Sequence, residues 1–311
     1  MSTTKVAIIG LGSTAVDLLT KIRLLSSSLL VAAIIGTAPD SEGIALATQL
    51  GIPIVSGFDE LVGLPDFDEI KIVFDATFAE AHRLNAARLA QYDKQLIGLT
   101  PTPVGPYIVP AVNLEQHLDA PYVSMVTCGG QSTVPIVAAI SQVTPVHYGE
   151  IVTTIASEPA GPGAQAHIRE LTETASAAIE AVGGAARGKA IMVVNSAERQ
   201  LIMRDTVRCL TAPLDEEARG DVRASIEAMV AGVAAYIPGY RLKQQVQVWT
   251  VGIEEPVAGR SGDLEPGEYD EVSVFLQVED APATLPGYLD MMTSAARVVA
   301  ERMALASSTE R

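Results

Sequence analysis

The feature that most constrains the fold lies at the start of the chain. Lys5–Ile9 is a short run rich in β-branched residues, and a turn containing two glycines follows it directly. Apolar residues then recur at helical spacing over Ser13–Leu25. A strand, a glycine turn and a helix in this order predict the first element pair of a βαβ fold with a parallel sheet.

The turn reads G-x-G-x-x-A and ends at Ala15. In this pattern the first glycine permits a tight turn, and the second lets the backbone approach a pyrophosphate. The small third residue allows helix and strand to pack closely. Helix amides then hold the phosphate without a basic side chain. We therefore predict a dinucleotide site, with a purely structural turn as the alternative. Its residues are Gly10, Leu11, Gly12, Ser13 and Thr14.

Strands and helices continue to alternate after this turn. The predicted strands are Leu29–Ile35, Ile70–Phe74, Leu96–Leu99 and Tyr122–Thr127, and the predicted helices span about 41–50, 79–91 and 134–143. Four prolines between Pro101 and Pro110 predict an irregular loop. Thr77 follows the third strand, at the edge where such sheets bind ligands, and we predict that it contacts the cofactor.

The pattern changes after Gly149. Longer strands are predicted at Glu150–Ser157, Lys189–Asn195, Gln244–Val251 and Glu271–Val278, with amphipathic helices at Ile168–Val182 and Glu216–Val233. These favour an antiparallel or mixed sheet with helices on one face. A last helix over Asp290–Ala306 could return to the first domain, and Ser307–Arg311 is predicted to be disordered.

The fold class is therefore α/β, with two domains. We expect an N-terminal Rossmann-like, doubly wound parallel sheet over residues 1–130, to which a helix at about 289–306 returns. Residues 131–288 are expected to form a second, α+β domain for catalysis and dimerisation. Hydrophobic residues make up 48% and aromatic residues 5% of the 311 residues, which suits helix-flanked sheets packed with small aliphatic side chains.

Composition excludes several classes of partner. The formal net charge of -16 would repel nucleic acid and anionic lipid. The apolar run Leu24–Ile35 is too short to span a bilayer, and we expect a cytoplasmic protein.

The four histidines show no metal-ligand spacing, so no metal site is predicted. His82 and His117 are expected on helix or loop surfaces.

Cys128 is the candidate nucleophile. It lies in M-V-T-C-G-G-Q, where a predicted strand ends before a helix. The dipole at a helix N-terminus favours the thiolate, and the flanking glycines give a substrate room to approach. Nearby amides could stabilise an oxyanion. The alternative is a small buried hydrophobic residue, which is how we interpret Cys209.

Several longer motifs resemble one known family. They include K-V-A-I-I-G from Lys5, M-V-T-C-G-G-Q from Met125, A-G-P-G from Ala160, L-I-M-R-D-T-V from Leu201 and L-D-M-M-T-S-A-A from Leu289. In order and spacing they are similar to the acylating acetaldehyde dehydrogenases. These are the bacterial enzymes that partner 4-hydroxy-2-oxovalerate aldolase in meta-cleavage pathways for aromatic compounds.

The resemblance implies a reaction and its site residues. Cys128 would attack acetaldehyde or propanal, hydride would pass to NAD, and coenzyme A would take the acyl group from the thioester, giving acetyl-CoA or propanoyl-CoA. Asp205 matches the family's acidic residue near the thiol, with an ion pair to Arg204 or another cation as its structural alternative. The resemblance also implies a homodimer within a hetero-oligomer that contains the aldolase.

The family's second cofactor-contacting segment maps onto nine consecutive residues. They are Pro159, Ala160, Gly161, Pro162, Gly163, Ala164, Gln165, Ala166 and His167. Tyr288 stands where the family has an asparagine that contacts the cofactor. The acid that usually ends the second strand is absent, and no arginine replaces it, so NADP is not excluded.

Two other functions remain as alternatives. One is a semialdehyde or acyl-phosphate reductase of similar architecture, which would need a histidine acid–base that no motif here supplies. The other is a catalytically weak NAD(P)-binding subunit that stabilises an aldolase partner.

Overall fold

The computed structural model describes residues 3–37, 41–156, 168–195, 203–254, 264–278 and 287–309. The chain forms two compact units. Unit 1 comprises Met1–Met125 and Met292–Arg311, and unit 2 comprises Val126–Met291. No helix among these residues combines the length and the apolar character needed to cross a membrane.

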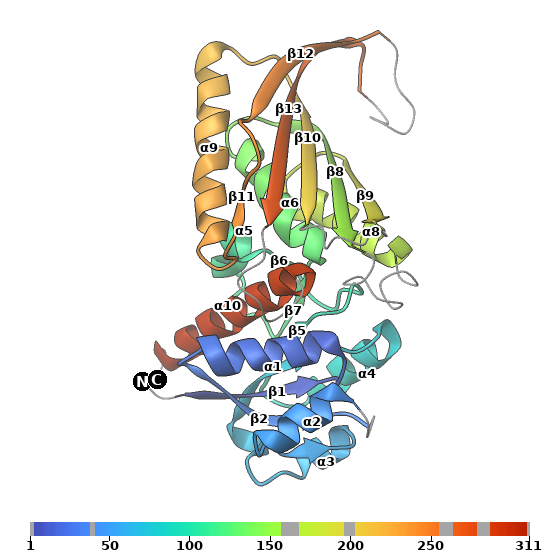
Figure 1. Cartoon of the computed structure of the whole chain (residues 1–311), viewed down its shortest axis with the longest axis vertical. Helices are drawn as coiled ribbons and strands as arrows, with labels where there is room; N and C mark the ends of the chain where they lie inside the picture. Colours follow the sequence, from blue (N-terminus) through green and yellow to red (C-terminus); the bar gives the residue numbers. More distant parts are fainter. Residues whose placement is uncertain are drawn as a thin grey trace. The chain divides into compact units, whose positions relative to one another are not determined.

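Unit 1 is built on a seven-stranded, fully parallel sheet (Figure 1). The strand order is β3-β2-β1-β4-β5-β7-β6. The strands are β1 (Thr4–Ile9), β2 (Leu29–Ile35), β3 (Ile54–Val55), β4 (Ile70–Asp75), β5 (Gln95–Gly98), β6 (Tyr107–Ile108) and β7 (Tyr122–Met125). The order reverses between β1 and β4, which makes their carboxyl ends the position where a Rossmann-like sheet binds its ligand.

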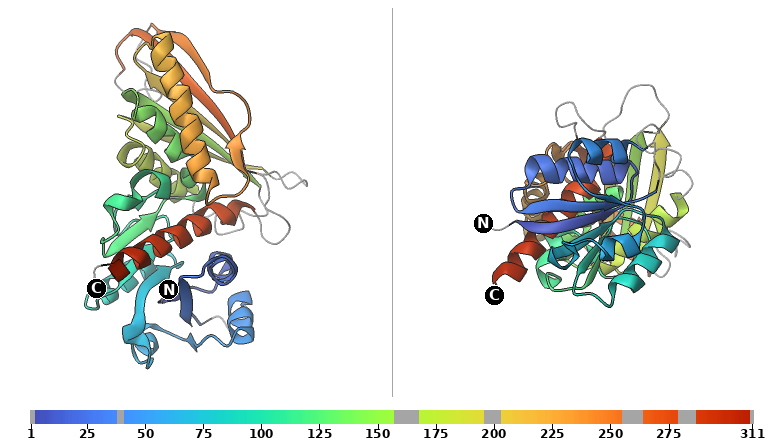
Figure 2. Two further views of the ribbon diagram at one scale, coloured as in Figure 1. Left: turned by 90° about the vertical axis from the view of Figure 1, so that its left-hand side faces the viewer. Right: turned by 90° about the horizontal axis from the view of Figure 1, so that it is seen from below.

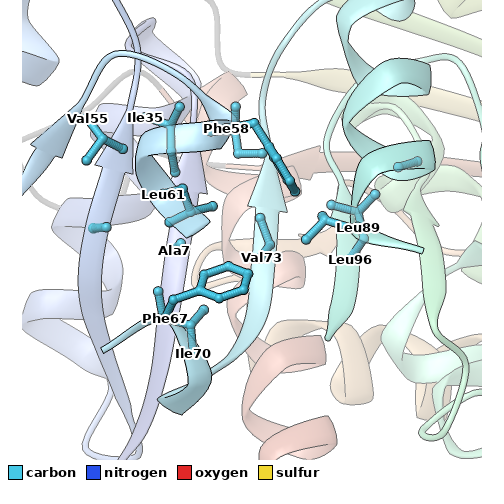
Figure 3. Packing of buried hydrophobic residues seen from close by; sticks show 13 residues of the cluster. Ala7, Ile35, Val55, Phe58, Leu61, Phe67, Ile70, Val73, Leu89 and Leu96 are labelled. Atoms are coloured by element: carbon cyan, nitrogen blue, oxygen red, sulfur yellow. The ribbon is translucent and has the colours of Figure 1, made fainter. Parts of the chain in front are cut away.

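Helices cover both faces of this sheet. They are α1 (Ser13–Leu25), α2 (Glu42–Gln49), α3 (Phe58–Val62), α4 (Ala79–Leu89), α5 (Pro110–Asn113) and part of α10 (Gly287–Thr309), with short 3-10 turns at Phe67–Glu69 and Leu114–Gln116. Because side chains alternate along a strand, Ala7 and Ile9 point to one face, where Phe58 and Leu61 of α3 pack (Figure 3). α1 lies on the opposite side of the strands (Figure 2).

Helix α10 is hydrogen-bonded to α1 through buried side chains. Lys21 donates a 2.8 Å hydrogen bond to the hydroxyl of Thr293, and it forms a 2.9 Å ion pair with Asp17 one turn earlier. Thr293 donates in turn to Asp17. This buried cluster connects the last helix of the chain to the first.

Unit 2 contains a six-stranded mixed sheet. Its strands are β8 (Val146–Ala156), β9 (Gly188–Asn195), β10 (Arg204–Thr211), β11 (Tyr240–Leu242), β12 (Gln247–Ile253) and β13 (Gly267–Val278). They run in the order β11-β13-β10-β8-β9, with β12 also paired to β13. Among the described strand pairs of this sheet, β8 and β9 run parallel to each other, and all the others are antiparallel. α6 (Cys128–Ser141), α8 (Ile168–Ala181) and α9 (Glu216–Ala234) lie on one face (Figure 1).

The predicted fold class is confirmed, but several local predictions are wrong. The Pro-rich stretch holds a short edge strand, β6, and a helical turn, α5, because Pro110 occupies the first helical position, where its missing N–H costs nothing. Helix α6 begins at Cys128 and not near Val134. Helix α10 extends to Thr309, so most of the predicted disordered tail is helical. Strand β10 was not predicted.

Candidate active site

The glycine turn of unit 1 has the geometry that its motif predicts. Gly10 has φ 129°, a conformation that favours glycine, and an added Cβ would lie 3.0 Å from the Ala76 carbonyl oxygen. Gly12 is the N-cap of α1 and carries no capping side chain. The first amides of α1 are consequently left for another acceptor. Ala15, the small third residue of the motif, is a buried residue of α1.

Thr77 lies beside this turn and forms part of a hydrogen-bonded cluster that we did not predict. Its amide donates to Asp75 Oδ1 over 2.9 Å and its hydroxyl over 2.5 Å. Asn85 donates to Asp75 Oδ2 over 2.9 Å, and His82 Nδ1 lies 3.1 Å from the same oxygen. Burial alone would raise the pKa of Asp75, but the donors His82, Thr77 and Asn85 hold this pKa below its usual value.

The prediction that His82 lies on the surface is therefore wrong. Its side chain is 1% exposed and packs so closely on Gly98 that a Cβ there would lie 2.7 Å from the imidazole. The histidine is buried because its helix, α4, presents it to the carboxylate of Asp75. The sequence signal was present, since Asp75 ends a strand and His82 lies in the first turns of the next helix.

Cys128 is the first residue of α6 in unit 2. Thr127 caps the helix, and its hydroxyl accepts a 3.1 Å hydrogen bond from the Gly130 amide. The Cys128 side chain is 8% exposed, whereas Cys209 is fully buried, as predicted for a core residue. Burial and the charge of Glu271 raise the pKa of Cys209 far above its ordinary value. Of the two thiols, only Cys128 lies at a helix N-terminus.

The glycine after Cys128 has a steric reason to be there. An added Cβ on Gly129 would lie 2.6 Å from the Thr153 hydroxyl oxygen of β8. The absence of a side chain therefore lets the first turn of α6 approach the sheet closely. Any side chain at this position would push the first turn of α6, which begins with Cys128, away from β8.

Asp205 lies on β10, with its side chain on the face that α6 covers. It is paired with Thr153 of β8, and both side chains are 2% exposed. Ser132 of α6 donates a hydrogen bond to Asp205 Oδ2. Arg204 is exposed on the strand's other face, so the ion pair considered above is not formed. Burial raises the pKa of Asp205 to about 7, against the opposing effect of the Ser132 and Thr153 hydroxyls.

Two groups of predicted site residues are not tested by this structure. Pro159–His167 lie outside the described residues. Tyr288 lies within α10, but its side chain is likewise outside them. Within the described ranges, no group of three His, Cys, Asp or Glu side chains could hold a metal ion.

Comparison with known proteins gives the family. Residues 128–286 match a model described as prokaryotic acetaldehyde dehydrogenase, dimerisation. Acetaldehyde dehydrogenase 2 of Rhodococcus erythropolis is 54% identical over 308 residues, covering 98% of both chains. The chain belongs to the acetaldehyde dehydrogenase family. Acetaldehyde dehydrogenase 1 of Nocardioides sp. is also 54% identical, with 98% coverage of each chain.

Membership of this family makes the chain an aldehyde dehydrogenase, and the dimerisation match supports a homodimer. Among solved structures, aspartate semialdehyde dehydrogenase II of Vibrio cholerae superposes with a TM-score of 0.59, covering 97% of this chain and 98% of that one. At 13% identity this likeness concerns the fold alone. The family predicted from the sequence motifs is confirmed.

Proposed function

We propose that this member of the acetaldehyde dehydrogenase family is an acylating enzyme that forms a thioester on Cys128 and transfers the acyl group to coenzyme A. The observation that carries the proposal is the place of Cys128, a thiol at the capped N-terminus of α6, the helix whose Ser132 donates a hydrogen bond to the buried Asp205. Relatives named acetaldehyde dehydrogenase support acetaldehyde as the substrate. We propose its homologue propanal as an alternative substrate.

The first half-reaction uses the thiol. The Cys128 thiolate adds to the aldehyde carbonyl, and the resulting oxyanion is stabilised by amides of the first turn of α6. NAD, when bound, accepts the hydride that leaves this adduct as it becomes a thioester. A thiolate suits both halves of the reaction, because it is a strong nucleophile and a good leaving group.

The second half-reaction needs a base. Asp205 is proposed to take the proton from the thiol of coenzyme A, whose sulfur then attacks the thioester carbonyl and expels the Cys128 thiolate. A carboxyl group with a pKa of about 7 suits this task, since it is partly ionised at neutral pH and is basic enough to accept a proton. The aldehyde is oxidised to the acyl level, and NAD is reduced.

We assign NAD to the carboxyl edge of unit 1. The fit rests on the positive-φ Gly10, its close approach to Ala76, and the uncapped N-terminus of α1. The residues proposed to contact NAD are Gly10, Leu11, Gly12, Ser13, Thr14, Thr77, Tyr288 and Pro159–His167. As a partner we propose 4-hydroxy-2-oxovalerate aldolase, with the homodimer forming part of a hetero-oligomer.

The two cysteines provide a matched test. Cys128→Ala is expected to lower coenzyme A-dependent NADH formation from acetaldehyde by at least about 10³-fold, while NAD binding, followed by fluorescence titration, is unchanged. Cys209→Ala should retain turnover. Mass spectrometry of the enzyme incubated with acetaldehyde and NAD should show one acyl group on Cys128. NADH formation that requires phosphate and not coenzyme A would refute the proposal, as would an active Cys128→Ala variant.

A further inference from the structure

The two carboxylate oxygens of Asp205 have different surroundings. Ser132, one helical turn after Cys128 on α6, donates to Oδ2. Oδ1 is buried and accepts no hydrogen bond within the described residues. The carboxylate is therefore held by one oxygen, and the other is left for a further partner.

Thr153 supplies a second polar atom at the same place. It stands directly opposite Asp205 in the β8–β10 pairing, so the two side chains leave the sheet together on the side of α6. Its hydroxyl faces the Cα of Gly129 and makes no hydrogen bond of full geometry in the described part of the chain, although it is near enough to the carboxylate to lower the pKa of Asp205. Two buried, unsatisfied oxygens beside the same helical turn are costly to keep unless the site uses them.

Ser132 itself is held firmly. Its main-chain carbonyl accepts a 2.6 Å hydrogen bond from the hydroxyl of Tyr240, at the start of β11. Both Ser132 and Tyr240 are buried. The turn of α6 that carries Cys128 and Ser132 is thus fixed from the sheet side. Residues four apart on a helix lie on one face, so Ser132 connects the thiol's face of α6 to the carboxylate.

We propose that Ser132 and Thr153 are positioning residues for the transfer of the acyl group from Cys128. Ser132 holds Oδ2 and so presents Oδ1 to the proton of the incoming thiol. Thr153 completes the hydrogen bonding of Oδ1 once Asp205 is ionised. The inference rests on the proposed function and deepens it, because it names the residues through which the base is oriented.

Several described side chains face Asp205 from the elements packed against it. They are Ser132 on α6, Thr153 on β8, Leu276 on β13 and Tyr240 on β11, and the Tyr236 phenol acts in turn on Tyr240. Among these described groups, only the two phenols titrate besides Asp205 itself. Since Asp205 raises the pKa of Tyr240 in addition to the effect of burial, the phenol stays neutral while the carboxyl titrates.

The test measures the pH dependence of acyl transfer from preformed acyl-enzyme to coenzyme A. Hydrogen bonds to a carboxylate favour its ionised form, so Ser132→Ala and Thr153→Val should each move the acidic limb upward by about one pH unit. Thr153→Ser keeps the hydroxyl and should restore the wild-type limb. Ser225→Ala is the matched control, because Ser225 also donates to α6, but to the carbonyl of Ala139 at its other end.

A second readout does not depend on turnover. The Asp205 carboxyl, labelled with ¹³C and assigned through Asp205→Asn, should titrate at higher pH in Ser132→Ala and Thr153→Val than in the wild type. Titration at the wild-type pH in both folded variants overturns the inference. Should Ser132→Ala fail to fold, the comparison of Thr153→Val with Thr153→Ser decides alone. A wild-type enzyme without coenzyme A-dependent turnover would refute the proposed function instead, and the ¹³C titration would still test the positioning roles.

Discussion

Two buried aspartates, Asp75 and Asp205, show how local partners determine whether a carboxyl group is charged. Asp75 in unit 1 is surrounded by donors from Thr77, Asn85 and His82, and these hold its pKa below the usual value although burial acts against them. Asp205 in unit 2 receives less compensation, and burial raises its pKa to about 7. The balance between burial and the donors therefore separates an aspartate that stays ionised from a carboxyl group that exchanges protons near neutral pH.

Asp205→Asn should remove turnover and improve stability above neutral pH. The folded state holds a proton on Asp205 between about pH 4 and 7 that the unfolded chain has already released, so wild-type stability falls as pH rises through this window. The asparagine variant avoids this cost, which amounts to a few kcal/mol at most.

Urea unfolding at pH 5 and pH 8 measures this difference. The stability of Asp205→Asn relative to wild type should increase between the two pH values. Asp270→Asn is the control, because the Thr250 hydroxyl, the Leu214 amide and the Arg219 guanidinium hold the pKa of Asp270 below its usual value although burial opposes them. None of these partners titrates between pH 5 and 8, so the loss of stability should be the same at both. A relative stability of Asp205→Asn that does not change with pH would contradict the assignment.

At the level of elements, α6 shows how a poor helix-forming sequence becomes a helix. Its first residues, Cys128–Thr133, include two glycines and few strong helix formers. Every residue from Cys128 to Ile140 is nevertheless buried. Packing against β8, β10, α8 and α9, together with the Thr127 cap, overrides the weak intrinsic preference.

Thr127→Ala tests what the cap contributes. Losing the hydrogen bond to Gly130 should lower stability by about 1 kcal/mol and alter the alkylation rate of Cys128 by iodoacetamide, because the first turn loosens around the thiol. Ser41→Ala removes the equivalent cap of α2, which accepts from Ile44. It should cost similar stability without changing the alkylation rate. Equal rates in all three proteins would show that the cap does not control the thiol.

Individual elements differ in how well the sequence predicts them. Strong local periodicity gives the first and last residues of α1 and β2 correctly. β10 was missed because its buried face carries Asp205 along with Val207 and Cys209, and exposed arginines interrupt the apolar run. Cys128 and its position at the end of a strand could be predicted. The roles of Ser132 and Thr153 could not, because they depend on the register between β8 and β10.

At the level of the whole molecule, unit 1 is discontinuous in sequence, and Thr293 of its last segment is hydrogen-bonded to a buried ion pair of α1. Asp17 is fully buried and Lys21 nearly so, and α10 contributes Thr293 to them. α10 also presents an apolar stripe at helical spacing, formed by Ala296, Val299 and Met303, all fully buried. The ends of the chain thus share one core.

Lys21→Met is expected to destabilise unit 1 by about 3–5 kcal/mol, because it leaves the Asp17 carboxylate buried without its cation. The double variant Asp17→Leu/Lys21→Met should recover most of this loss, since no uncompensated charge remains. Lys5→Met removes an ion pair to the exposed Asp66 and should change little. Thermal unfolding of the four proteins gives the comparison, and a double variant less stable than Lys21→Met would contradict it.

The discontinuity of unit 1 has a consequence during synthesis. A ribosome that has translated Met1–Met125 must produce all of Val126–Met291 before Met292 and the residues after it emerge. Until then the nascent unit 1 lacks the apolar stripe of α10 and the Thr293 hydroxyl that binds Lys21 and Asp17, so the later unit can close its own core first. A chain stalled before α10 would expose this incomplete unit to chaperones and proteases.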